Sequence, residues 1–152
     1  MSEKELIREV CLNNNDAIAF IEVLARASQA MDDMVDMDKP LSRQDKQTLF
    51  WDLLITLPSN PFYLRHQNML MPVMANALND WFTGNELERQ PGNQQDLMVA
   101  YVLRDNLAAV VSQVAWIVGG PQWMHDISPR IRRFVHDEPL TRYMKNLEND
   151  NG

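Results

Sequence analysis

The sequence contains only one cysteine, Cys11, among its 152 residues. A single cysteine excludes an intramolecular disulfide and is typical of a reducing compartment, so we expect a cytoplasmic protein. A catalytic thiol needs a nearby histidine, and the spacing of the histidines places none beside Cys11. We therefore interpret Cys11 as a small buried residue near the end of the first helix.

Long apolar runs are also absent. No stretch of about 18 uninterrupted apolar residues occurs, so no transmembrane helix is expected. The N-terminal sequence MSEKELIREV is charged and lacks the apolar centre of a secretory signal. We expect no membrane partner.

Basic residues are few. Lys and Arg number 14 against 21 Asp and Glu, which gives a formal charge of −7. Binding to a phosphate backbone requires clustered Lys and Arg, so direct nucleic-acid binding is not expected.

Hydrophobic residues, by contrast, make up 45% of the chain, which is enough for a folded core. They include ten Met and four Trp, residue types that are frequent at partner-binding surfaces. The length suits one domain, and we expect a single helical domain over residues 1–148 with a frayed C-terminus over residues 149–152.

Helix-start signals recur along the chain, whereas the alternation typical of strands does not appear. Ser2 with Glu5 forms a capping-box pattern for a first helix, and residues 13–16 separate it from a second. A third helix is expected after Ser42 and a fourth after Asn60. The second helix carries an apolar stripe at helical spacing: Ala17, Phe20, Ile21, Leu24, Ala27, Met31 and Val35.

Further helices are expected in the second half of the chain. The fourth helix should span residues 61–82 and kink at Pro72, and residues 83–95 should form a polar loop. A central apolar helix should span residues 96–118. Proline at positions 129 and 139 should divide the remaining chain into short helices. The predicted fold is therefore an all-α bundle of about five main helices with a short, proline-broken helical C-terminal tail.

Four aspartates, Asp32, Asp33, Asp36 and Asp38, fall within seven positions at the end of the second helix. Carboxylates this dense repel one another, so a divalent cation, a basic partner or water must neutralise them. Asp32 and Asp36 lie one turn apart and can bridge a hard cation such as Mg²⁺ or Mn²⁺. A solvated helix end and a docking patch for a basic partner are the alternatives.

Two polar residues of the fourth helix, Asn76 and Asp80, lie on one face. If short loops make successive helices antiparallel, the second and fourth helices run in the same direction and both acidic ends meet. Asp32, Asp36, Asn76 and Asp80 are therefore the candidate metal ligands.

The sequence Asp32-Asp33-Met34-Val35-Asp36 resembles the DDxxD motif of class I isoprenoid and terpene synthases, in which the motif binds magnesium that holds a substrate diphosphate. Asn79, Asp80 and Thr83 resemble the start of that family's second metal motif, with Leu87 at its Glu position between Glu86 and Glu88. Arg142 and Tyr143 resemble a late Arg-Tyr pair of some members. The resemblance is local, and it implies a magnesium site that binds a diphosphate.

The one basic cluster, "RIRRFVH", contains Arg130, Arg132 and Arg133. These arginines are candidates for phosphate binding, for docking onto the acidic end of another subunit, or for a solvated face.

Two functions are consistent with these observations. The favoured one is a non-enzymatic helical interaction or regulatory protein, self-associating as a homodimer, with Trp81, Trp116 and Trp123 as candidate contact residues. It requires no cofactor. The alternative is a small Mg²⁺- or Mn²⁺-dependent enzyme acting on a phosphate or diphosphate ester, for which the sequence identifies no catalytic base or nucleophile.

Overall fold

The computed structural model describes residues 1–36 and 40–151, and the side chains of residues 1–36 and 40–148. Every regular element within these ranges is a helix, which confirms the predicted all-α class. No single helix in the described ranges is long and apolar enough to span a membrane. One bent combination, residues 94–104 with 107–148, passes that test by length and composition only.

The first two helices begin where their capping residues predict. In α1 (Glu3–Val10) the hydroxyl of Ser2 accepts a hydrogen bond from the Glu5 backbone N–H, and the Glu5 carboxylate accepts one from the Ser2 N–H. In α2 (Asn15–Asp36) the Asn14 side chain accepts a bond from the backbone N–H of the first turn. The predicted stripe of α2 is largely buried, but Val35 is exposed because it lies beyond the last packed turn.

A continuous helical rod comes next, made of α3 (Arg43–Trp51), the π-helical turn η1 (Asp52–Thr56) and α4 (Leu57–Ser59). The Ser42 hydroxyl caps α3, as predicted. In η1 the N–H of Leu57 bonds to the carbonyl of Asp52, five residues earlier. This wide turn places Asp52 and Leu57 on the same side, and both are buried.

Helix α5 (Pro61–Arg89) is longer than predicted, and the predicted loop over residues 83–95 is wrong in its first half. Gly84 explains the difference. It is buried against α6 (Gln94–Arg104), where a Cβ at position 84 would lie 3.4 Å from Leu103 Cβ. The glycine lets two antiparallel helices approach closely instead of ending the helix.

The distortion in α5 lies at His66, whose backbone is non-helical (φ −117°, ψ 21°), and not at Pro72 as predicted. A proline ring clashes with the carbonyl four residues earlier, here that of Asn68, so His66, six residues before Pro72, is beyond its direct reach, and the helix accommodates Pro72 without leaving helical geometry there. The His66 ring packs on Phe62, with ring centroids 4.7 Å apart.

The predicted helix over residues 96–118 is two elements, α6 and α7 (Leu107–Val135). The chain leaves helical geometry at Asp105 (φ −93°, ψ 46°), whose carboxylate lies 2.7 Å from Nδ1 of the distant His136. Within α7 the chain leaves helical geometry at Gly120 (φ 87°), two residues after the predicted end of the helix at residue 118. Pro129 does not interrupt α7, contrary to the prediction. Pro139 does precede a new helix, α8 (Leu140–Asn151).

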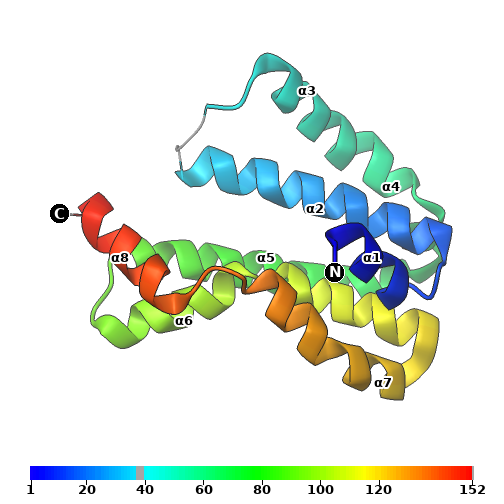
Figure 1. Ribbon diagram of the computed structural model, residues 1–152. Coiled ribbons are helices and arrows are strands. Elements are labelled where there is room, and N and C mark those ends of the chain that lie inside the picture. The colour runs from blue at the N-terminus through cyan, green and yellow to red at the C-terminus, as the bar shows by residue number, and fades with distance from the viewer. Residues whose placement is uncertain (37–39, 152) are drawn as a thin grey trace.

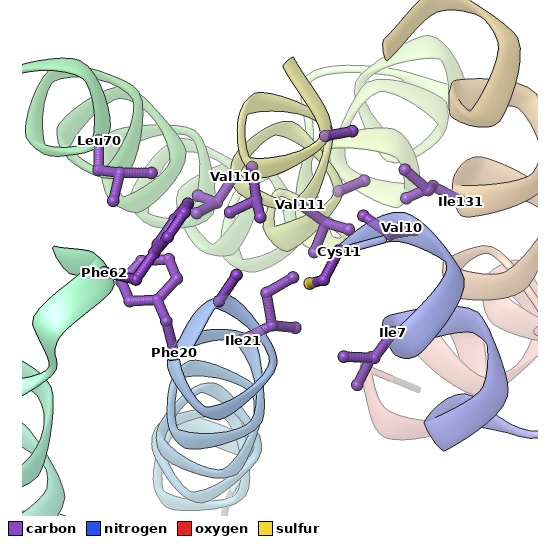
Figure 2. Close-up of a cluster of buried hydrophobic side chains, with 14 of the residues drawn as sticks. Ile7, Val10, Cys11, Phe20, Ile21, Phe62, Leu70, Val110, Val111 and Ile131 are labelled. Carbon is purple, nitrogen blue, oxygen red and sulfur yellow. The ribbon is translucent and has the colours of Figure 1, made fainter. Parts of the chain in front are cut away.

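Helix α2 lies between the α3–α4 rod and a layer formed by α5, α6 and α7 (Figure 1). The core fills the junction of α1, α2, α5 and α7 (Figure 2). Its largest fully buried side chains include Phe20, Ile21, Leu70, Ile127 and Ile131. The indole N–H of Trp123 donates to the Val10 carbonyl across 3.0 Å and ties α1 to α7.

Cys11 is fully buried at the end of α1, as predicted. Burial, with a contribution from Glu22, raises the pKa of its thiol from 9.0 to about 12. The thiolate fraction at neutral pH is then about a thousandfold below that of a free cysteine.

We expect Cys11 in the native protein to resist alkylation by iodoacetamide, and Cys11 of the same protein in 6 M guanidinium to react at once, as measured by mass spectrometry. Equal rates in both states would contradict this burial.

Candidate functional site

Helices α2 and α5 run in the same direction, as the sequence predicts. At their first turns the side-chain amide of Asn60 donates to the Asp16 carbonyl across 3.1 Å. Near their far ends the indole Nε1–H of Trp81 donates to Asp32 Oδ1 across 3.4 Å. The acidic end of α2 therefore lies against the last third of α5.

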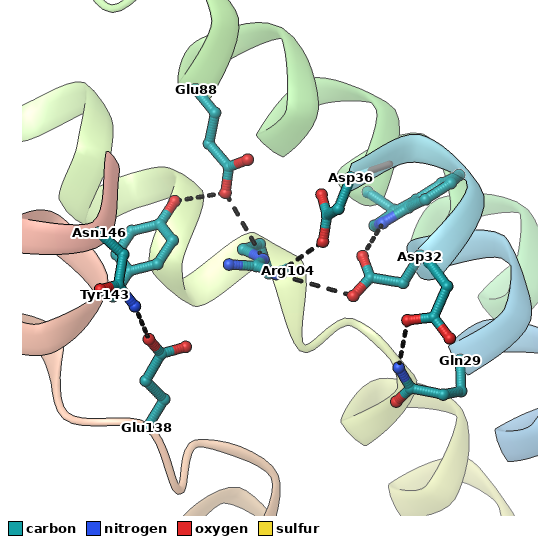
Figure 3. Close-up of polar contacts among 10 residues, drawn as sticks. Gln29, Asp32, Asp36, Glu88, Arg104, Glu138, Tyr143 and Asn146 are labelled. Carbon is teal, nitrogen blue, oxygen red and sulfur yellow. Dashed lines mark hydrogen bonds and ion pairs between the residues drawn. The ribbon is translucent and has the colours of Figure 1, made fainter. Parts of the chain in front are cut away.

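The group that meets these carboxylates is a guanidinium. Arg104, at the end of α6, places its Nη2 3.6 Å from Asp32 Oδ2 and 3.5 Å from Asp36 Oδ2. Its Nε lies 3.5 Å from Glu88 Oε1 on α5 (Figure 3). Arg104 therefore joins α2, α5 and α6 at one point, which we call the Arg104 cluster (Asp32, Asp36, Glu88, Arg104 and Tyr143).

Tyr143 brings α8 to the same point. Its hydroxyl donates to Glu88 Oε1, and its ring lies 5.3 Å from the Arg104 guanidinium carbon, within cation–π range. Burial and the bond to Glu88 raise the pKa of Tyr143 well above its usual value. The phenol is therefore a stable donor and not a base at neutral pH.

The Arg104 cluster is partly buried: the side chains of Arg104 and Glu88 are 25% and 14% exposed. Burial alone would lower the pKa of Arg104. The carboxylates of Glu88, Asp32 and Asp36 outweigh it, and the net pKa is raised. One cation faces three carboxylates, so the cluster keeps an excess of negative charge.

The predicted metal ligands are only partly brought together. Asp32 and Asp36 do converge, but around Arg104. Within the described residues, no three His, Cys, Asp or Glu side chains are placed to hold a metal ion, so Asp80 does not complete a site with that pair. Asn76 is exposed on α5. Of the other two aspartates, Asp33 accepts a bond from Gln29, and Asp38 lies outside the described residues.

The three candidate phosphate-binding arginines have other surroundings. Arg130 donates to both carboxylate oxygens of Glu9 on α1, and this bond lowers the pKa of Glu9. Arg132 donates to the Asp105 carbonyl across 3.5 Å, and Arg133 is exposed. Two of the three therefore serve contacts inside the chain.

Beside the Arg104 cluster lies an apolar cavity of about 670 Å³, which we call the interhelical cavity. It opens between α2, α5 and α7, and its apolar lining includes Leu24, Ala27, Met31, Tyr63, Met74, Leu78, Trp81, Val110 and Phe134. A polar pocket of about 100 Å³ adjoins it. The two share Asp32, Arg104, Asp105, Val135 and Asp137.

A second feature is the outer side of the α3–η1 rod, which we call the rod face: Phe50, Trp51, Leu54 and Ile55. These side chains are 60%, 63%, 72% and 47% exposed. The opposite side of the same rod carries buried Leu49 and Leu57. A helix that is apolar on both sides normally has a second packing partner.

The tryptophans named from the sequence do not lie on this face. Trp81 is half-buried against Asp32 and Trp123 points inward to α1, whereas Trp116 is 40% exposed on α7. Trp51 and Arg104 were not predicted from the sequence. The adjacent apolar residues in "LFWDLLI", residues 49–55, could have indicated that Trp51 lies on an apolar surface, because a helix cannot bury all of them on one side. Nothing in the neighbouring sequence distinguishes Arg104 from the other arginines.

Searches with this chain found no matching protein-family model, no matching curated protein and no matching solved structure.

Proposed function

We propose that this chain is a non-enzymatic interaction protein that self-associates through its rod face. The exposure of Phe50, Trp51, Leu54 and Ile55 on one continuous helical surface carries the proposal. Fully burying side chains of this size is worth about 1.5–3 kcal/mol each, so leaving four in water is costly. A contiguous exposed apolar patch of this kind marks an interaction surface.

A second copy is the partner that this surface fits. Most soluble oligomers are symmetric dimers in which the same patch meets itself, and an apolar helical face is self-complementary. The flanking charges Arg43, Asp45 and Lys46 on α3 are of mixed sign, so an antiparallel pairing of two rods can match them. Trp51 is central to the patch and of the residue type that most often dominates interface energies.

The test is the mass of the protein in solution. We expect sedimentation equilibrium of the full chain to give a dimer at micromolar concentration, and the double variant Trp51→Ser, Leu54→Ser to be monomeric. Loss of two central apolar contacts should weaken self-association at least about a hundredfold.

A matched control exists on α6, where Met98 and Val102 are also exposed and one turn apart. Met98→Ser, Val102→Ser also replaces two exposed apolar side chains by serine, on another helix, and should leave the dimer intact. A monomeric native chain, or a dimer that both variants weaken equally, would refute the rod face as the interface.

A further inference from the structure

The interhelical cavity has the size and lining of a small-molecule site, and this inference does not depend on self-association. Its volume of about 670 Å³ lies in the range of ligand pockets, which is about 300–1,000 Å³. Ala27 and Ala77 contribute small side chains to its wall, and Met31, Met71 and Met74 contribute adaptable ones. An apolar group of several carbons would find apolar partners on α2, α5 and α7.

The charged side chains of the cavity select the polar end of such a ligand. Among the described residues that line it, Glu3, Asp32, Asp105 and Asp137 stand against the single cation Arg104. Glu138 adds a further carboxylate in the adjoining polar pocket. An anionic ligand would meet this excess of negative charge, and Arg104, the cation that lines the cavity within the described ranges, already faces three carboxylates.

Aromatic rings stand at the same end. Trp81 lines the cavity, and Tyr101 and Tyr143 line the adjoining polar pocket. Indole and phenol faces attract cations, and the Tyr143 ring already holds the Arg104 guanidinium in this way. Carboxylates and aromatic faces together are the surroundings that an ammonium group prefers.

We propose that the interhelical cavity binds a small amphipathic cation, with its apolar chain between α2, α5 and α7 and its ammonium group among Asp32, Asp105 and Asp137. His136 lies 2.7 Å from Asp105 Oδ2, so Asp32 and Asp137 are the main carboxylates for this contact, with Asp32 shared with Arg104 and Trp81. The apolar chain supplies most of the affinity, and the ammonium supplies the selectivity.

Three probes with one apolar body and different head groups test the charge selectivity: dodecylammonium, dodecanol and dodecanoate. Each is titrated below its aggregation concentration into the full chain by isothermal calorimetry. We expect saturable one-site binding of dodecylammonium, at least tenfold tighter than dodecanoate, with dodecanol between them. Equal or tighter binding of dodecanoate, or no saturable binding of any probe, would overturn the proposal.

Two pairs of variants locate the site. Ala75→Trp places a large ring into the cavity from an exposed wall position, whereas Ala19→Trp adds the same ring to an exposed position of α2 outside it. Ala75→Trp should weaken dodecylammonium binding at least tenfold, and Ala19→Trp should not.

The second pair tests the carboxylate. Asp137→Asn should lower the ratio of the affinity for dodecylammonium to the affinity for dodecanoate. Asp126→Asn removes one charge on α7 outside the lining and should leave this ratio unchanged. Indistinguishable effects within either pair would show that the probe binds elsewhere.

Discussion

Replacing Arg104 by alanine is expected to cost the protein about 2–4 kcal/mol of its free energy of unfolding, the largest effect of any single charged side chain that we describe. The variant leaves Asp32, Asp36 and Glu88 together without the cation that they share. Removing one partner of a buried ion pair costs about 3–5 kcal/mol, and partial exposure of this cluster reduces that figure. Chemical denaturation of both proteins at pH 7 measures this loss of free energy of unfolding.

The pH dependence separates lost charge pairing from lost packing. The raised pKa of Arg104 keeps it charged through the whole acid and neutral range, so in the native chain its own protonation does not change there. In Arg104→Ala the carboxylates repel at neutral pH and gain protons as the pH falls. We therefore expect the difference in free energy of unfolding between the native chain and Arg104→Ala to become smaller toward pH 4.

Arg89→Ala is the matched control for Arg104→Ala. Arg89 pairs with Glu86 on the surface of α5, where both side chains are more than half exposed. Such pairs contribute about 0–1 kcal/mol, so the control should unfold almost as the native chain does. If Arg104→Ala behaves like Arg89→Ala, the Arg104 cluster does not hold the helix ends together.

The second large effect is expected at Arg26, whose alanine variant should lose about 2–3 kcal/mol. Arg26 Nε and Nη2 donate to the two carboxylate oxygens of Asp52, both across 3.2 Å. Asp52 is only 4% exposed, so Arg26→Ala leaves a buried carboxylate without its charged partner. The helical rod of α3, η1 and α4 would then be held on α2 by apolar contacts and by the bond from Asn60, at the end of α4, to the Asp16 carbonyl.

Asp52→Ala should cost less, about 1 kcal/mol, although it breaks the same ion pair. The Arg26 side chain is 54% exposed and can be hydrated when the carboxylate is gone. A double-mutant cycle of Arg26→Ala and Asp52→Ala measured by urea unfolding gives the coupling directly. Equal costs for the two single variants would show that Asp52 is hydrated in the native state.

Much of the helical framework could be predicted because its signals are local. Ser2, Ser42 and Asn60 accept bonds from backbone N–H groups three residues later, and such caps depend on a few adjacent residues. The same locality explains the errors. Gly84 disrupts a helix in isolation, but here its close contact with α6 keeps it inside one. Pro129 is itself exposed, and the buried Ile127 and Ile131 on either side of it anchor that part of α7.

The acidic end of α2 was also visible in the sequence, but its neutralising group was not. The co-directional arrangement of α2 and α5 follows from short connections, and contacts at both ends confirm it. Arg104 comes from another helix far along the chain, and no periodicity relates it to Asp32. The local DDxxD resemblance therefore identified the carboxylates without identifying the guanidinium that they face.

By itself, the sequence determined that this chain is helical, where most helices begin and where its acidic residues gather, because capping, periodicity and charge density act over a few residues. Only the tertiary structure decided which cation meets those acids, which apolar side chains stay in water on the rod face, and that a cavity remains between α2, α5 and α7. Those outcomes depend on packing between segments distant in the chain, and packing is decided by the shapes of all the partners at once.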